Sequence, residues 1–78
     1  MMITPAQCKA GRALIDMDQA DLAARASVSR NTIVDFEKGR RVPNPNNLAA
    51  IRAAIEAAGV ELIDQNGGGP GVRLKAAP

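Results

Sequence analysis

The segment from Gln19 to Lys38 constrains the fold of this 78-residue chain more than any other part. It reads QADLAARASVSRNTIVDFEK and contains two short apolar stripes at helical spacing with a turn between them. The apolar positions are Leu22, Ala23 and Ala26 in the first stripe, Val28 in the turn, and Ile33 and Phe36 in the second. Helices this short are unstable alone, so each must bury its stripe against the other and against flanking elements. The segment therefore predicts a helix-turn-helix.

Capping residues set the limits of these two helices. Asp18 can cap a helix over about residues 19–26. The negative charge of Asp21 in its first turn interacts favourably with the helix dipole. Ser29 can cap the next helix, which should reach Glu37 or Lys38. Gly39 then ends it as a left-handed residue.

Similar signals predict one helix before and one helix after this segment. Thr4 followed by Pro5 favours a helix that reaches about Ile15. Asn44 followed by Pro45 favours another, over about residues 45–58, which Gly59 ends. The positions expected to face inward are Cys8, Gly11, Leu14 and Ile15 in the first of these helices, and Leu48, Ile51, Ile55 and Ala58 in the second.

The last part of the chain has a different pattern. Residues 60–64 and 72–75 alternate apolar with polar side chains, as strands with one buried face do, and a glycine-rich turn separates them. One interpretation is a disordered tail, because an isolated hairpin is only marginally stable. The other is a hairpin that joins two subunits through Val60, Leu62, Val72 and Leu74. We therefore divide the chain into a helical domain, 1–59, and a β tail, 60–78, as a possible dimerisation element.

Composition excludes several other classes. With Cys8 as its single cysteine and no histidine, the chain has no internal disulfide, and a protein zinc site is strongly disfavoured. Cys8 itself fits a small core residue better than a reactive thiol. No signal peptide or membrane span is evident, so we expect a cytoplasmic protein that needs no cofactor or metal.

Positive charge gathers in the central segment although the net charge is only +2. The basic residues there are Arg25, Arg30, Lys38, Arg40 and Arg41, opposed by Asp35 and Glu37. Taken singly, each arginine fits an ordinary solvated surface. Clustered around one helix and its following loop, they indicate binding of a polyanion.

Residues 4–58 resemble the Cro/Xre family of phage-repressor-like helix-turn-helix DNA-binding proteins. The matching residues are Gln19, Leu22, Ala23, Val28, Ser29, Ile33, Phe36, Glu37 and Gly39. Ser27 departs from the pattern, because the family often has glycine there, and a serine adopts the turn with some strain. The resemblance implies a mainly α fold, a four-helix helix-turn-helix domain, to which this chain adds a short C-terminal β-hairpin or strand pair.

In this fold the second helix of the motif lies in the major groove of double-stranded DNA, with its N-terminal residues against base edges. The expected base readers are Arg30, Asn31, Val34 and Asp35. Arg30 suits guanine, Asn31 adenine and Val34 a thymine methyl group. Asp35 can accept from cytosine, repel other sequences or simply solvate the helix.

The resemblance also implies contacts to DNA phosphates. Gln19 matches the family's phosphate-clamping glutamine, and its own N–H at a helix start adds to that role. The full set of expected phosphate contacts is Gln19, Ser29, Thr32, Lys38, Arg40 and Arg41. Glu37 instead resembles an internal glutamate of the family, for which Arg12 is a plausible ion-pair partner.

These expectations favour a dimeric transcriptional repressor on a pseudo-palindromic operator, because one recognition helix reads only a few base pairs. Half-sites would lie about 34 Å apart or at multiples of that distance. The alternative is an antitoxin or adaptor whose tail binds another protein, such as a toxin, by strand addition. An enzyme is disfavoured, because the sequence has no histidine and no catalytic partner for its cysteine.

Overall fold

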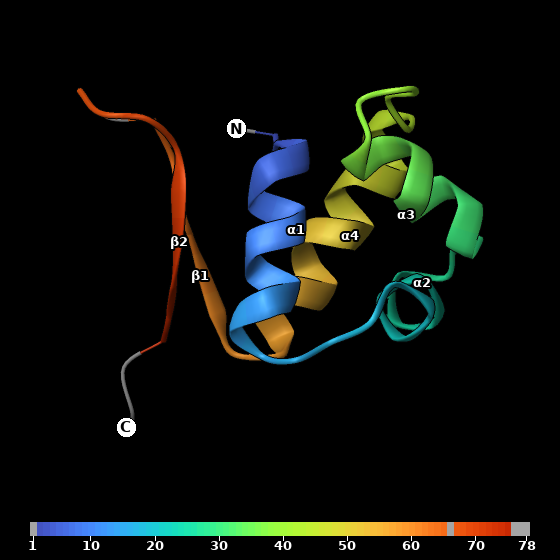
Figure 1. Ribbon diagram of the computed structural model, residues 1–78, viewed down its shortest axis with the longest axis horizontal. Coiled ribbons are helices and arrows are strands. Elements are labelled where there is room, and N and C mark those ends of the chain that lie inside the picture. The colour runs from blue at the N-terminus through green and yellow to red at the C-terminus, as the bar shows by residue number, and fades with distance from the viewer. Residues whose placement is uncertain (1, 66, 76–78) are drawn as a thin grey trace.

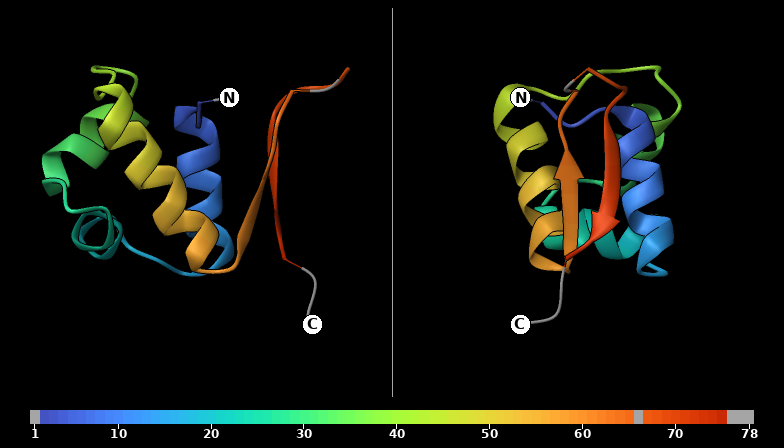
Figure 2. Two further views of the ribbon diagram at one scale, coloured as in Figure 1. Left: turned by 180° about the vertical axis from the view of Figure 1, so that it is seen from behind. Right: turned by 90° about the vertical axis from the view of Figure 1, so that its left-hand side faces the viewer.

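The computed structural model describes residues 2–65 and 67–75 and has three layers (Figure 1). Its elements are α1 Pro5–Leu14, α2 Gln19–Ala26, α3 Arg30–Glu37, α4 Pro45–Ala57, β1 Val60–Ile63 and β2 Gly71–Leu74. Helices α1 and α4 form the middle, with α2 and α3 on one side and the two strands on the other (Figures 1 and 2). The predicted four-helix domain with a C-terminal strand pair is confirmed.

The four predicted N-caps are all present. The side chains of Thr4, Asp18, Ser29 and Asn44 each accept a hydrogen bond from the backbone N–H three residues further on. Each bond satisfies one of the amide groups that a helix start leaves without a partner. The sequence therefore determined where each helix begins.

The helix ends also follow local rules, with one correction. Gly39 is left-handed at φ 73°, as predicted, and its N–H donates to the carbonyl of Phe36. Helix α1, however, ends at Leu14, and the prediction that Leu14 faces inward is wrong, since its exposure is 42%. The chain turns at Asp16, which has φ 51°, so that Ile15 and Met17 pack on the core instead.

One hydrophobic core holds both the helices and the hairpin. Leu22, Ile33, Ile51 and Ile55 are fully buried, and Val60 of β1 belongs to the same cluster. Helix α1 comes close to this cluster at Gly11, where an added Cβ would lie 3.1 Å from Cγ2 of Ile55. The core is thin and mostly aliphatic, so α1 must come close to pack against it. Gly11 allows this approach because it has no side chain.

The two strands form an antiparallel hairpin that is fastened to α1. Val60 lies opposite Leu74, and Ile63 lies opposite Gly71. Gln7, which is 2% exposed, donates through Nε2 to the carbonyl oxygens of Ile63 at 3.0 Å and Gly71 at 3.1 Å. A buried amide with both protons engaged fixes the hairpin against the helices.

Candidate nucleic-acid interface

The turn between α2 and α3 presents the start of α3 to solvent. Ser27 adopts the left-handed conformation at φ 56°, and Val28 then packs against the core. The Ser29 hydroxyl accepts from the Thr32 N–H at 3.1 Å and lies 2.8 Å from the Thr32 hydroxyl. This cap starts α3 in a fixed orientation, with its first turn facing outward.

The four predicted base readers differ in exposure. Arg30 and Asn31 are exposed at the first two positions of α3, whereas Val34 and Asp35, one turn on, are half-buried. The carboxylate of Asp35 also lies 3.9 Å from the guanidinium of Arg40. Arg30 and Asn31 are thus the most exposed of the four and the best placed to meet a base edge.

The buried carboxylate of Glu37, the last residue of α3, joins three helices. Glu37, whose side chain is 4% exposed, accepts from Nε and Nη2 of Arg12, both at 2.7 Å. It also accepts from the Cys8 thiol at 3.1 Å and from Nε2 of Gln19 at 3.1 Å. Arg12 in addition donates to the carbonyl oxygen of Met17 at 2.9 Å. The expected Arg12–Glu37 ion pair is present, in the two-pronged geometry that favours buried pairs.

The same contacts shift three pKa values. Burial would raise the pKa of Glu37, but hydrogen bonds from Arg12, Cys8 and Gln19 outweigh it, so the pKa is lowered. The hydrogen bond to Glu37 raises the pKa of Arg12. Burial, followed by the hydrogen bond to Glu37, raises the pKa of the Cys8 thiol far above its usual range. Cys8 is therefore an inert core thiol, and Glu37 stays ionised.

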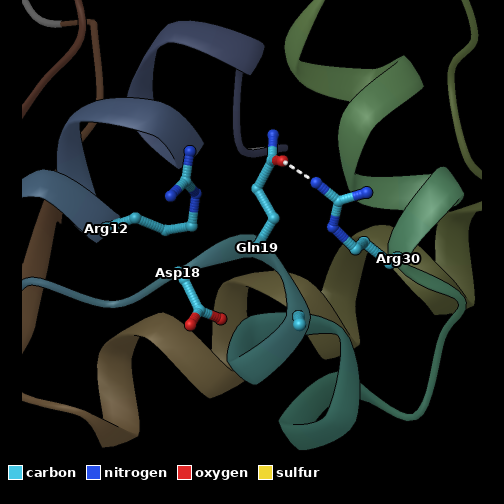
Figure 3. Close-up of a pocket in the computed structure, with 5 residues that line it drawn as sticks. Arg12, Asp18, Gln19 and Arg30 are labelled. Carbon is cyan, nitrogen blue, oxygen red and sulfur yellow. Dashed lines mark hydrogen bonds between the residues drawn. The ribbon is translucent and has the colours of Figure 1, made fainter.

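Gln19 connects this buried pair to the exposed face. While Nε2 of Gln19 donates to Glu37, its Oε1 lies 3.5 Å from Nη2 of Arg30 (Figure 3). Around these side chains lies an open depression of about 490 Å³, lined by Arg12, Asp18, Gln19, Ala20 and Arg30. Its lining combines the guanidinium groups of Arg12 and Arg30 with the carboxylate of Asp18, and Arg12 is already paired with Glu37.

The remaining predicted phosphate contacts lie after α3. Lys38, Arg40 and Arg41 are exposed, and they occupy the end of α3 and the loop that leads to α4. The backbone N–H of Arg40 donates to the carbonyl oxygen of Asp35 at 2.9 Å, which fixes the direction in which the loop leaves the helix. The structure thus puts basic side chains at both ends of α3.

Comparison with known proteins agrees with this geometry. A family model described as helix-turn-helix, of the Cro/C1 type, matches residues 9–59. The chain belongs to this helix-turn-helix family. A comparison with curated proteins found no match. Membership supports a DNA-binding regulator in general, and none of the described helices is long and apolar enough to cross a membrane.

Sequence reasoning overlooked one residue of the helix-turn-helix domain and assigned another too narrow a role. Arg12 was expected only as a partner of Glu37, yet it also lines the depression beside Gln19. Gln7 was not singled out, although Thr4 and Gln7 form a capping box, with the Thr4 N–H donating to Oε1 of Gln7 at 3.0 Å. The Thr-x-x-Gln spacing was the signal that could have revealed it.

The predicted dimer contacts separate into two groups. Val60 is 0% and Leu62 6% exposed, because both side chains lie in the core of their own chain. Val72 is half-buried, and Leu74 is 55% exposed. Among these four residues, Val72 and Leu74 are the ones near enough to the surface to meet another molecule.

Proposed function

We propose that this helix-turn-helix protein is a sequence-specific transcriptional regulator, a dimeric repressor that places α3 in the major groove and acts in the cytoplasm. The observation that carries the proposal is the connected set of side chains from Arg12 through Glu37 and Gln19 to Arg30. A side chain held by such a framework reaches a base edge in a defined position, which sequence-specific readout requires.

Arg30 and Asn31 are the principal base readers in this proposal. Arg30 can donate two hydrogen bonds to O6 and N7 of guanine, and Asn31 can pair with adenine. Val34 supplies an apolar contact to a thymine methyl group. Asp35, held near Arg40, accepts from cytosine or excludes other bases. The site therefore reads only a few base pairs.

Phosphates would occupy the flanks of α3. On one side, the depression at the start of α2 offers the guanidinium of Arg12, the amide of Gln19 and the N-terminal end of a helix. The hydroxyls of Ser29 and Thr32 lie at the start of α3, and Lys38, Arg40 and Arg41 lie beyond its end. Contacts on both flanks would fix the register of α3 on the duplex.

A dimer follows from the small number of bases that one α3 can read. Two recognition helices about one helical turn of DNA apart, on the same face of the duplex, can read a pseudo-palindrome together. The hairpin lies at the end of the molecule away from α2 and α3 (Figure 1), so pairing through it leaves both recognition helices uncovered.

Selection of bound sequences from random duplexes tests this proposal. A dimeric repressor enriches a palindrome whose half-sites are one helical turn apart. Enrichment of no sequence would exclude the base-reading roles. Enrichment of a single half-site would exclude the dimer on DNA.

Two alanine variants test the division into residues that read bases and residues that contact phosphates. Arg30→Ala should cost on the order of 1–3 kcal/mol on the selected site and relax the preference at one position. Arg41→Ala should weaken binding to all duplexes alike and lower the slope of log K against log salt by about one. Arg25→Ala, on the exposed end of α2 and paired with Asp21, is the matched control. If Arg30→Ala and Arg41→Ala behave alike, the division is wrong.

A second candidate function is that of an antitoxin or adaptor whose hairpin holds another protein. The open side of β2, with the exposed Leu74, favours it, since a sheet edge can accept an added strand. Purification of the tagged chain from its native cells distinguishes the two functions. A stoichiometric partner that is lost when β2 is altered supports the adaptor, and a chain that purifies only with itself supports the repressor.

A further inference from the structure

The backbone of β2 has hydrogen-bonding groups that face away from β1. The N–H of Lys75 donates to the carbonyl of Gly59 at 2.9 Å, which makes these two residues a hydrogen-bonded pair. Because such pairs alternate along an antiparallel ladder, Arg73 with Glu61 is also hydrogen-bonded, whereas Leu74 with Val60 is not. The N–H and C=O groups of Val72 and Leu74 therefore point outward.

This outer edge is open to solvent, and the corresponding edge of β1 is not. Val60 is 0% and Leu62 6% exposed, counting their backbone atoms. On β2, Leu74 is 55% exposed, and no hydrogen bond to the backbone of Val72 or Leu74 is seen in the described part of the chain. An open edge with free backbone groups is a template for another strand.

An exposed leucine of β2 and an exposed leucine of α1 lie at one level along the molecule. Gln7 bonds to Gly71, and from there α1 and β2 run in the same direction (Figures 1 and 2). Seven helical residues and three strand residues each cover about 10 Å, which brings Leu14 and Leu74 to the same level. Both are among the exposed large hydrophobic side chains of the described surface. A strand added to β2 would run beside Leu74.

We infer that β2 pairs antiparallel with β2 of a second copy, with Val72 of each copy opposite Leu74 of the other. This inference rests on the proposed dimeric repressor and specifies its interface. The edge is self-complementary, since Val72 and Leu74 each offer one donor and one acceptor, and four backbone hydrogen bonds form around the two-fold axis. The result is a four-stranded sheet that spans both subunits.

The ion pairs of the hairpin make this register tolerable. The two copies of Arg73 lie opposite each other at the axis, where like charges repel. Each Arg73 offsets this repulsion by its cross-strand ion pair with Glu61 of its own chain. The row across the sheet reads acid, base, base, acid and is neutral in sum. The same row makes position 73 a direct probe of the axis.

Disulfide trapping tests the register. In Arg73→Cys the two new thiols lie on a non-hydrogen-bonded pair about 4.5 Å apart between Cα atoms, which a disulfide can bridge. Glu61→Cys is the matched control, because it also removes the ion pair but lies about 14 Å from its copy, three strand spacings away. Cys8 is buried and does not compete. Mild oxidation should link Arg73→Cys and leave Glu61→Cys monomeric on a denaturing gel. Linkage of Glu61→Cys alone would place the axis at β1 and overturn the inference.

Leu74→Pro removes the outward N–H without touching the ladder inside the hairpin. Its mass in sedimentation should fall from dimer to monomer, while its circular dichroism matches that of the unaltered chain. Leu74→Thr, which keeps the N–H, should remain more dimeric than Leu74→Pro.

The outcomes separate this inference from the function on which it rests. A dimer that enriches a palindrome but neither links through position 73 nor responds to Leu74→Pro overturns the β2 interface and leaves the repressor standing. A chain that links through position 73 but enriches no sequence supports the interface and excludes the repressor.

Discussion

Two serines in the turn between α2 and α3 have opposite effects on stability. Ser27 is left-handed, with φ 56° and ψ 41°, whereas Ser29 has φ −73° and caps α3. A left-handed side chain costs about 1–2 kcal/mol, part of which glycine returns as greater entropy of the unfolded chain. The cap is worth about 1 kcal/mol.

Ser27→Gly should therefore stabilise the protein by roughly 0.5–1 kcal/mol, and Ser29→Ala should destabilise it by about 1 kcal/mol. For a domain of this size, each kcal/mol moves Tm by about 4–8 °C. Thermal unfolding followed by circular dichroism measures both variants. A fall in Tm for Ser27→Gly would show that the turn is not strained.

Glu37 makes stability depend on acid pH. Its pKa is lowered in the folded chain, so its contribution is complete above the unfolded value of about 4.3 and is lost as the pH falls through the lower folded value. Glu37→Gln should cost on the order of 3 kcal/mol at pH 7, because it leaves Arg12 without its partner. Below about pH 4.3 its stability should fall less steeply than that of the native chain, by up to about 1.4 kcal/mol per pH unit.

Urea unfolding between pH 2.5 and 7 checks this prediction. Asp16→Asn is the control, because it removes an exposed carboxylate and keeps a residue that tolerates the left-handed turn. If Asp16→Asn reduces the loss of unfolding free energy at acid pH as much as Glu37→Gln does, the Arg12–Glu37 pair is not the source of the pH dependence.

At the level of elements, the hairpin depends on one side chain of α1. Gln7→Met keeps the size of the residue but removes the acceptor for the Thr4 N–H and the donors to Ile63 and Gly71. The Thr4 N–H then loses its acceptor, and the half-buried carbonyls of Ile63 and Gly71 each lose one of their donors, at a cost of about 1–3 kcal/mol. Hydrogen exchange should show faster opening of β1 and β2 than of α3.

Gln7→Glu separates the two roles of this residue. A carboxylate still accepts from Thr4, so the first turn of α1 should keep its protection, but it repels the two carbonyl oxygens of the hairpin. Gln65→Glu, on the exposed turn, is the control. Equal protection of the hairpin from exchange in Gln7→Glu and Gln65→Glu would show that the bonds from Gln7 do not hold the hairpin in place.

The limits of the elements were largely predictable, because caps and left-handed residues are local signals. Ser29 and Gly39 act where their residue types indicate. The prediction that Leu14 faces inward was wrong, because helical periodicity does not show how far the neighbouring elements extend. At Leu14, the last residue of α1, they no longer cover the helix. The bonds from Gln7 to Ile63 and Gly71 span 56 and 64 residues, a separation that no local pattern encodes.

For the whole molecule, the tail is part of the single core as well as a possible interface. A chain that ends after Asp64 loses β2 and uncovers Leu62, which β2 faces through Val72. We expect a loss of about 2–4 kcal/mol, since one or two aliphatic side chains become exposed. Leu74→Pro should stay within about 1 kcal/mol of the native chain, because Leu74 is already exposed. Denaturant unfolding compares the two, and equal losses would mean that β2 adds nothing to the core.

The candidate site was predictable to the extent that the family pattern reaches. The positions of Arg30 and Asn31 at an exposed helix start, and the Arg12–Glu37 pair, agree with that pattern. The link through Gln19 and the burial of Val60 arise from how three layers meet in space. Alternation showed that one face of the hairpin is buried but not whether its own helices or a second copy cover that face.

The bonds of Gln7 also bear on how the protein folds. Its amide donates to Ile63 and Gly71, which lie 56 and 64 residues further along the chain. Contacts between residues so far apart in sequence form slowly, because a long loop must close before the contact offsets the lost entropy. A protease that cuts the exposed glycine-rich turn between β1 and β2 would therefore separate the helices from both the Gly71 contact and the strand that we assign to dimerisation. The remaining fragment could occupy a half-site only singly and only weakly.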